Sequence, residues 1–169
     1  MSWNHQSIII RSATLADYDG MRVLLAEVDE LHRFSLPWMF QKPAVEARPR
    51  EFFEQLLDDQ DCAVLVAEAN HQLVGMATAL LRASPTFALF ITQRWGVLDN
   101  IAVSNGWRRR GIGTALIRDA ERWAKLQGAN WLELGVYEFN QEARAFYTSL
   151  GYLPVSTKLR KPFDREPEG

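Results

Sequence analysis

The amino-acid sequence predicts a layered α/β domain built on a mixed β-sheet. Three observations lead to this prediction. Short apolar, β-branched runs alternate along the chain with longer stretches whose apolar residues recur at helical spacing. The length of 169 residues suits one domain with a full core, because folding at that size buries about 70% of the chain's surface. No internal repeat and no Gly/Ser- or Pro-rich linker divides the chain, so we expect a single domain over residues 1–169.

The N-terminal part of the chain predicts a strand followed by a long helix. Residues 8–11 form a short apolar run that ends in arginine, which is typical of a buried strand. Thr14 and Asp17 can supply an N-cap and an acidic first turn, and apolar residues then recur every three or four positions over residues 15–33. Three prolines within residues 34–49 predict a loop whose apolar side chains can form the wall of a site.

The rest of the chain continues the alternation of helices and strands. The expected elements are a helix over residues 50–58, hairpin strands over 62–68 and 73–81, a strand over 97–103, a helix from 114 to Gly128, a strand over 131–137, a helix that Asn140 can cap and Gly151 ends, and a final strand over 152–159. Residues 82–94 give no clear prediction. Phe87, Phe90 and Trp95 could form a lid, a dimer contact or ordinary packing.

Composition and charge narrow the class of protein. The net charge is −2, from 19 basic and 21 acidic side chains, whereas a nucleic-acid-binding protein usually has a basic excess. Cys62 is the single cysteine, so no internal disulfide can form. No apolar run is long enough to cross a bilayer, and the first residues lack the pattern of a signal peptide. We therefore expect a soluble cytoplasmic protein with no nucleic-acid or membrane partner.

The segment from Val103 to Thr114 carries the clearest chemical signal. It joins a predicted strand to the start of a predicted helix, where up to four backbone N–H groups are unpaired and about half a positive charge gathers. Gly111 and Gly113 would let an anion approach the backbone closely. Three arginines add charge and paired donors, at Arg108, Arg109 and Arg110. This pattern predicts a phosphate or pyrophosphate site. The alternative is a glycine-assisted turn beside a solvated arginine cluster.

Two well-known phosphate motifs are near misses. The P-loop pattern G-x-x-x-x-G-K-S/T fails because Ile112 stands where lysine is required. The dinucleotide pattern G-x-G-x-x-G fails because Leu116 fills its third glycine position. A nucleotide-phosphate enzyme of another fold is therefore a weaker hypothesis, and it would predict that ATP or NAD binds at this site.

The spacing R-x-x-G-x-G at Arg108, Gly111 and Gly113 resembles the acyl-CoA signature of the GNAT superfamily of N-acyltransferases. The segment from Asn140 to Tyr152 resembles that family's second hallmark, N-x-x-A-x-x-F/L-Y-x-x-L-G-F/Y. Residues 98–103 resemble its fourth strand. The likeness covers about residues 7–162 and is strongest over residues 97–152.

The resemblance implies a mixed, mostly antiparallel sheet with helices on both faces, whose strands four and five splay apart to admit the pantetheine arm. It implies acetyl-CoA as co-substrate, without a metal. The cofactor-binding residues that it implies are Ile101, Ala102 and Val103 on strand four, Arg108, the amides of Arg109, Arg110, Gly111, Ile112, Gly113 and Thr114, and Asn140 and Tyr147. Asn140 would bond the pantetheine arm or order its loop as an N-cap.

The chemistry of amine acetylation gives Tyr147 a role. A lysine-like amine with a pKa near 10.4 is neutral in about one molecule in a few thousand at pH 7, so neutralising it costs about 4–5 kcal/mol. The departing thiolate also needs a proton, and a general acid contributes about 10²–10⁴-fold. Tyrosine, with an ordinary pKa near 10, is protonated at pH 7 and can donate. The resemblance points the Tyr147 hydroxyl at the thioester sulfur, whereas packing on the sheet is the alternative for this side chain.

The general base is less clear than the acid. Many relatives carry a glutamate on strand five at the position of Gly135, so the usual base is missing there. Glu133 and Asp99 are the candidates, acting directly or through water; as the alternative, each is a strand-end carboxylate in a salt bridge or hydrogen bond. His32 is a further candidate base.

The acceptor side would come from the first helices and the loop between them. Its candidate residues are Glu30, His32 and Phe40, and the carboxylates at 27, 29 and 30 either attract a cationic amine or form a solvated helix face. We expect an acetyl-CoA-dependent N-acetyltransferase that acts on a primary amine of a small molecule or protein, by direct attack in a ternary complex. A non-catalytic acyl-CoA sensor on the same fold is the alternative, and a homodimer is possible.

Overall fold

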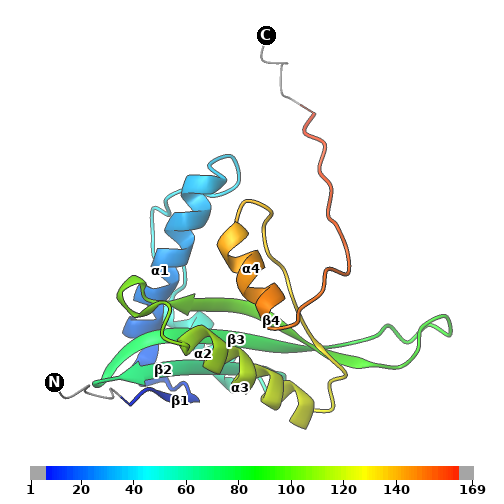
Figure 1. Ribbon diagram of the computed structural model, residues 1–169, viewed down its shortest axis with the longest axis horizontal. Helices are drawn as coiled ribbons and strands as arrows, with labels where there is room; N and C mark the ends of the chain where they lie inside the picture. The colour runs from blue at the N-terminus through cyan, green and yellow to red at the C-terminus, as the bar shows by residue number, and fades with distance from the viewer. Residues whose placement is uncertain (1–6, 164–169) are drawn as a thin grey trace.

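The five strands of the sheet stand side by side in the order in which they occur along the chain (Figure 1). The structure is a computed structural model and describes residues 7–163. Its strands are β1 (Ile9–Ser12), β2 (Cys62–Ala69), β3 (Gln72–Ala83), β4 (Arg94–Val103) and β5 (Leu132–Leu134). Its helices are α1 (Tyr18–Ser35), α2 (Arg50–Asp58), α3 (Ile112–Leu126) and α4 (Gln141–Ser149), with short 3₁₀ turns at Leu15–Asp17 and Asn105–Trp107.

The sheet is mixed and mostly antiparallel, as predicted. Strands β1 to β4 pair antiparallel with their neighbours, and β5 pairs parallel to β4. The β4–β5 ladder joins only Gly96–Leu98 to Leu132–Leu134, whereas β4 continues to Val103 with β3 as its partner. Strands β4 and β5 therefore separate beyond Leu98, which confirms the expected splay.

A β-bulge in β4 lies at the point where the two strands separate. Thr78 is opposite Asn100 and Ala79 is opposite Leu98, so Asp99 has no partner on β3. A bulge bends the strand and increases its twist. It also shifts the alternation of side chains by one residue, so that Leu98 and Ile101 both pack in the core on the α3 side. The pairing register was not predictable from the sequence of β4 alone.

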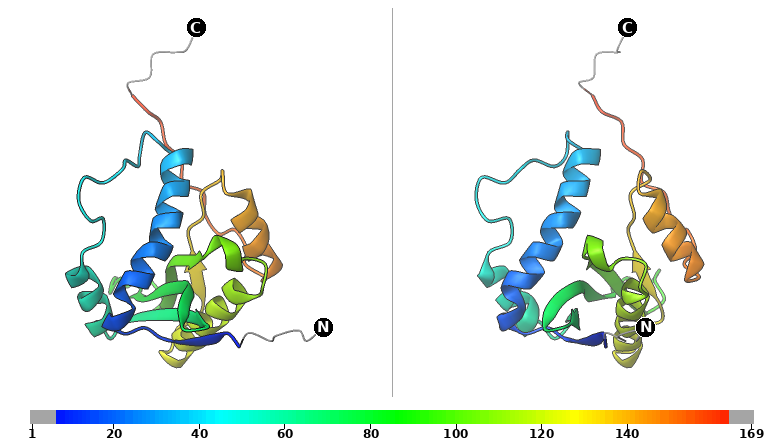
Figure 2. Two further views of the ribbon diagram at one scale, coloured as in Figure 1. Left: turned by 90° about the vertical axis from the view of Figure 1, so that its left-hand side faces the viewer. Right: turned by 60° about the vertical axis from the view of Figure 1, so that its left-hand side comes forward.

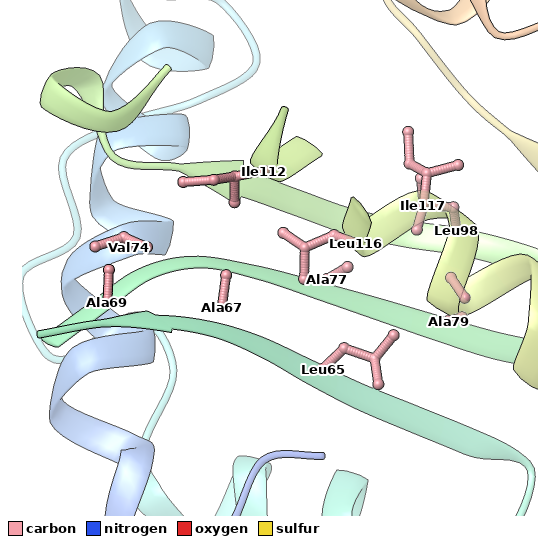
Figure 3. Packing of buried hydrophobic residues seen from close by; sticks show 11 residues of the cluster. Leu65, Ala67, Ala69, Val74, Ala77, Ala79, Leu98, Ile112, Leu116 and Ile117 are labelled. Atoms are coloured by element: carbon pink, nitrogen blue, oxygen red, sulfur yellow. The ribbon is translucent and has the colours of Figure 1, made fainter. Parts of the chain in front are cut away.

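Helices cover both faces of the sheet, as expected. On one face, Met21 and Leu24 of α1 and Phe53 of α2 pack with Val66 and Met76 of the sheet. On the other face, α3 packs on β2 and β3, and Figure 3 shows Leu116 and Ile117 above Leu65 and Ala77. Figure 2 shows α1 and α4 on either side of the connection between β4 and α3. None of the helices within residues 7–163 has the length and apolar character needed to cross a bilayer.

Two of the predicted strands differ from the structure. The predicted final strand over residues 152–159 is wrong, because this segment forms no ladder with the sheet and Leu153, Val155 and Leu159 are exposed. The strand predicted over residues 131–137 is shortened to Leu132–Leu134, since the splay removes its partner. Alternating apolar residues indicate that a segment can form a strand, but the tertiary structure decides whether an edge is available.

A partly buried ion cluster holds the turn before α1. The Arg11 guanidinium donates two hydrogen bonds of 2.8 Å to the two oxygens of Asp17, and Arg11 Nη2 lies 2.9 Å from Glu68 Oε2 on β2. The backbone N–H of Thr14 also donates to Asp17 at 2.8 Å. Asp17 is 9% exposed, and the Arg11 hydrogen bonds lower the pKa of its carboxyl below the ordinary value of 3.8.

Replacing this carboxylate should make the protein less stable in a pH-dependent way. Asp17→Asn is expected to lower the free energy of unfolding at pH 7 by about 1.5–3 kcal/mol, because it breaks charged hydrogen bonds in a buried position. The pKa of Asp17 is lower in the folded state than in the unfolded state, where it is about 3.9. The carboxylate therefore contributes its full stabilisation above about pH 3.9, and this stabilisation is lost as the pH falls through the pKa of the folded state. Urea unfolding at pH 7 and near pH 2 measures both quantities.

The matched control is Asp19→Asn, two residues further along, where the side chain is 86% exposed and pairs loosely with Arg22 at 3.9 Å. We expect it to change stability by less than about 0.5 kcal/mol. An equal loss for the two variants, or a loss for Asp17→Asn that is the same at both pH values, would contradict the role of the cluster.

Candidate active site

A row of unpaired backbone donors lies at the start of α3. Within the described residues, the N–H groups from Arg109 to Thr114 donate no hydrogen bond, and the helical ladder starts with Ala115 N–H on the Gly111 carbonyl at 3.0 Å. Arg109 and Gly111 have φ values of +63° and +79°, in the left-handed region. Backbone that alternates in this way forms a concave nest of N–H groups that suits an anion. The positive end of the α3 dipole reinforces it.

The three arginines of the signature do different things. Arg108 Nε donates to the Val103 carbonyl at 3.0 Å, which ties the loop back to the end of β4. The Arg110 guanidinium lies 4.8 Å from the centre of the Trp107 ring. Arg109 is exposed and donates to Glu142 on α4 at 2.9 Å. The backbone therefore supplies the converging donors, and Arg108 and Arg110 support the loop that presents them.

Glu27 of α1 supports the same loop, which the sequence did not predict. Its carboxylate accepts from Asn105 N–H at 3.1 Å and from the Ser104 hydroxyl at 3.3 Å, and it lies 4.0 Å from Arg108 Nη2. The sequence predicts Glu27 either as an attractant for a cationic amine or as part of a solvated helix face, whereas in the structure it binds this loop. Glu27 comes three residues after the buried Leu24, so helical spacing weakly indicates that its side chain faces the rest of the molecule. The sequence could not identify Asn105 as its partner, because the two residues are almost eighty positions apart.

Helix α4, with Asn140 as its N-cap, packs on the start of α3. Asn140 Oδ1 accepts from Ala143 N–H at 3.1 Å, so Asn140 is the N-cap that its position predicts. Phe146 packs on the start of α3, where a Cβ atom on Gly113 would lie 3.2 Å from the Phe146 ring. Gly113 therefore allows the two helices to approach closely.

Tyr147 is half-buried between two other aromatic rings. The Phe146 and Tyr152 ring centres lie 5.5 and 5.9 Å from the Tyr147 ring centre. Its hydroxyl makes no hydrogen bond with any other residue in the described range, whereas the Tyr152 hydroxyl donates to Glu121 at 2.8 Å. Burial raises the pKa of Tyr147 above its ordinary value of 10, so the phenol keeps its proton at neutral pH. Its hydroxyl is therefore available as a proton donor.

The edge of β4 beside the splay carries free backbone groups. Beyond Leu98, this strand pairs only with β3, so the groups on its other edge have no strand partner among residues 7–163. Ile101 and Val103 pack on the α3 side, whereas Ala102 is buried on the α1 side. The Val103 carbonyl already accepts from Arg108 Nε. The free edge over residues 99–103 runs toward the nest of N–H groups.

The two candidate bases have different surroundings. Glu133 accepts from the indole N–H groups of Trp95 at 3.0 Å and Trp131 at 3.2 Å, and these two rings stack with centres 5.6 Å apart. Both carboxylate oxygens of Glu133 therefore accept hydrogen bonds, which agrees with the alternative of a hydrogen-bonded strand-end carboxylate. Asp99 is the exposed bulge residue at the opening of the splay, and it accepts from the Asn100 side chain at 2.6 Å. The structure thus leaves Asp99 freer than Glu133.

Two of the three candidate acceptor residues come together. The His32 ring on α1 stacks on Phe40 with centres 5.4 Å apart and meets Tyr137 edge-on at 5.4 Å and Phe139 at 6.2 Å. Burial lowers the pKa of His32, which favours the neutral imidazole. Tyr137 and Phe139, which follow β5, were missed as members of this cluster.

The remaining polar candidates on α1 do not join this cluster. Glu30 is exposed and pairs with Arg33 at 3.2 Å, and Asp29 is held by Arg48 at 2.9 Å.

Burial raises the pKa of the Cys62 thiol to about 11, so it is a poor nucleophile at neutral pH. No set of three or more His, Cys, Asp and Glu side chains within residues 7–163 is arranged to hold a metal ion. A hollow of about 420 Å³ between α1 and residues 41–48 lies apart from the nest.

The comparisons with known proteins agree with this geometry. The sequence profile of the acetyltransferase (GNAT) family matches residues 25–152. The chain is 26% identical over 143 residues to the uncharacterized N-acetyltransferase YhfO of Bacillus subtilis, covering 85% of this chain and 88% of that protein. It is 29% identical over 154 residues to an N-alpha-acetyltransferase of Sulfurisphaera tokodaii, covering 86% and 80%. The fold is similar to aminoglycoside N-acetyltransferase AAC(6')-Iy in complex with CoA, with a TM-score of 0.70, 19% identity and 99% of both chains covered.

Proposed function

This chain belongs to the GNAT family of acetyltransferases, and on that premise we propose that it transfers an acetyl group from acetyl-CoA to a primary amine by direct attack in a ternary complex. The observation that carries the proposal is the nest of unpaired N–H groups from Arg109 to Thr114 at the end of a splayed strand. An acyl-CoA needs such a site, because its pyrophosphate is a compact anion and its pantetheine arm carries amides that pair with a strand edge.

The residues fit a CoA molecule in three places. The amides of Arg109–Thr114 would hold the pyrophosphate, with the exposed Arg109 side chain beside them. The free edge of β4 at Ile101, Ala102 and Val103 would pair with the pantetheine amides. Asn140 stands at the start of α4, where its side-chain amide N–H groups remain able to donate while Oδ1 caps the helix.

The chemistry follows from the groups around the splay. The neutral amine attacks the thioester carbonyl carbon, which forms a C–N bond, and collapse of the tetrahedral species then breaks the C–S bond. The sulfur leaves as a thiolate and takes a proton from the Tyr147 hydroxyl. Asp99 is our proposed acceptor for the amine proton, directly or through water, because its carboxylate is exposed at the opening of the splay. Glu133 would first have to release its two indole partners.

We propose that the acceptor lies against the aromatic cluster of His32, Phe40, Tyr137 and Phe139. These rings join α1 and its following loop to the segment after β5, on the side where the acceptor was expected. Aromatic faces favour cationic groups, so an amine-bearing acceptor suits them.

Thiol release in the presence of an amine panel tests the proposal. At saturating acetyl-CoA, the chain should release CoA only when an accepted primary amine is present, and the product should gain one acetyl group by mass. The panel should contain aminoglycosides, polyamines, and peptides with free N-terminal or lysine amines. Tight acetyl-CoA binding with no amine-dependent release across the panel would count against transfer and would favour an acyl-CoA sensor.

A further inference from the structure

Two acidic side chains from different helices contact the loop that forms the nest. Helix α1 lies on one side of the connection between β4 and α3, and α4 lies on the other (Figure 2). From α1, Glu27 reaches the start of this connection at Ser104 and Asn105. From α4, Glu142 reaches it further along, at the Arg109 side chain. The two carboxylates therefore hold different parts of one loop.

The nest depends on support from its surroundings. Arg109 has a φ value of +63°, in the left-handed region that residues other than glycine adopt at a cost in free energy. Among residues 7–163, the amides from Arg109 to Thr114 donate no hydrogen bond that would fix them. Backbone of this kind keeps its conformation only when the surrounding contacts determine it. The contacts that hold the loop just before Arg109 should therefore decide how well the nest is formed before an anion binds.

Glu27 caps the turn that leads into the nest. This turn, Asn105–Trp107, is a short 3₁₀ helix, and the side chain of Ser104 before it makes no capping hydrogen bond. One Glu27 oxygen accepts from the Asn105 N–H at 3.1 Å, and the other accepts from the Ser104 hydroxyl at 3.3 Å. The carboxylate also lies 4.0 Å from Arg108 Nη2. Glu27 thus takes the place of a local cap and stands beside the residue that precedes Arg109.

The anchor of Glu27 is well buried, and its charge is directed at the turn. Met21, Leu24 and Leu25 fix α1 in the core, and the Glu27 side chain is itself only 27% exposed. Among residues 7–163, the backbone N–H that donates to this carboxylate is that of Asn105. Glu27 therefore holds the loop while the amides of the nest stay free.

Glu142 has the opposite relation to the nest. It accepts from the Arg109 guanidinium at 2.9 Å, and the two side chains are 64% and 82% exposed. An exposed ion pair of this kind contributes little to stability. An anion in the nest would compete with Glu142 for this cation. Loss of the Glu142 charge should therefore help an anion to bind, whereas loss of the Glu27 charge should hinder it.

We propose that Glu27 is a positioning residue for the cofactor, whose carboxylate holds residues 104–108 in the form that presents the nest amides to the CoA pyrophosphate. It acts through Ser104, Asn105 and Arg108. This role deepens the proposed function and rests on it, because the nest is taken as the pyrophosphate site. A carboxylate near an anion site would by repulsion alone weaken anion binding. A positioning role requires the opposite sign.

Two charge-matched substitutions test this role. Glu27→Gln and Glu142→Gln each remove one negative charge beside the same loop, so repulsion alone would make both variants bind CoA more tightly. We expect Glu27→Gln to raise the Kd for CoA by about tenfold, because a neutral amide holds the turn less firmly than a carboxylate. Glu142→Gln should keep the Kd or lower it by up to about fivefold. Isothermal titration of the full chain with CoA measures both.

Further measurements separate positioning from damage to the fold. At about 0.5 M salt, the Kd ratio between Glu27→Gln and the wild type should persist, because the hydrogen bonds are local, whereas the effect of Glu142→Gln should vanish. Damage to the fold would instead lower the binding stoichiometry and the unfolding temperature, at an unchanged Kd of the folded molecules. Ser104→Ala removes one donor to Glu27, so it should raise the Kd by about two- to threefold in the wild type and leave it unchanged in Glu27→Ala.

The outcomes distinguish this role from the assignment of the nest itself. A Kd for Glu27→Gln at or below the wild-type value would overturn the positioning role. So would a loss of stoichiometry alone, or additive effects of Ser104→Ala and Glu27→Ala. If Glu27→Gln does not fold, an unchanged Kd in Ser104→Ala would overturn the role. A wild-type chain that binds no CoA would overturn the nest as the pyrophosphate site, and the proposed function with it.

Discussion

Tyr147→Phe is expected to lower kcat for acetyl transfer by about 10²–10⁴-fold while leaving the affinity for acetyl-CoA almost unchanged. The change removes one oxygen atom and keeps the ring, which packs between Phe146 and Tyr152. The Tyr147 hydroxyl holds no hydrogen bond to another described residue, so its loss should not disturb the fold. The deficit corresponds to about 3–5 kcal/mol of lost transition-state stabilisation. Steady-state kinetics and calorimetric titration with acetyl-CoA measure the two quantities.

The adjacent tyrosine is the control for this prediction. Tyr152→Phe removes a hydroxyl from the same aromatic group, but this hydroxyl is bound to Glu121 and has no proposed part in the chemistry. We expect a loss of about 1 kcal/mol in stability and a kcat within about threefold of the wild type. If Tyr147→Phe also kept its kcat, the tyrosine would be a packing residue and the acid would have to be sought elsewhere.

The pH profile gives a further test of the same residue. Burial raises the pKa of Tyr147, so the acid form persists above pH 10. A proton donor of this kind does not reduce kcat between pH 7 and pH 9, whereas rising pH increases the fraction of neutral amine. The rate should therefore rise across this range for the wild type. A fall of kcat between pH 7 and pH 9 would contradict tyrosine as the acid.

Gly111→Asp is expected to weaken CoA binding by about 10–100-fold. Gly111 is the N-cap of α3, with φ at +79°, and a Cβ atom there would meet no other atom within 4 Å. The new side chain thus has room, but it places a negative charge in the nest that we propose for the pyrophosphate. At an effective dielectric constant of about 20, two like charges about 6 Å apart repel by about 3 kcal/mol before salt screening. Isothermal titration with CoA at low and moderate salt would measure the loss.

Gly111→Asn provides the matched variant. Asparagine has the same size and shape as aspartate and tolerates the left-handed region equally well, but it is neutral. It should bind CoA within a few-fold of the wild type, and both variants should show similar thermal unfolding. Equal CoA affinity of the two variants would count heavily against the nest as the pyrophosphate site.

The helices that cover the sheet were easier to predict from the sequence than the strands at its edge. Helices α1 and α3 were predictable because their apolar residues recur at helical spacing and must be buried on one side. The strand predicted over residues 152–159 was wrong because alternating apolar residues show that a segment can form a strand, but not whether it pairs with an edge of the sheet. The bulge at Asp99 was not predictable, since it depends on which residue of β3 faces each residue of β4.

The site shows the same division. The glycines and the polar run between β4 and α3 indicated an anion site, because the free amides of a helix start are a local property of the backbone. The sequence could not show that Arg108 turns back to the Val103 carbonyl or that Glu27 supports the loop from α1. Nor could it choose between Glu133 and Asp99, whose difference arises from the two tryptophans that hold Glu133.

The sequence by itself determined most of the helices and strands, the family, and the segment whose amides we propose to bind a diphosphate. These follow from the period of apolar residues, from the two sequence motifs and from local backbone geometry. Only the tertiary structure decided which carboxylate remains free at the splay, which aromatic rings gather around His32, and that residues 153–163 form no strand of the sheet. These properties depend on contacts between residues tens of positions apart, and side-chain patterns along one segment carry no information about the distance to another.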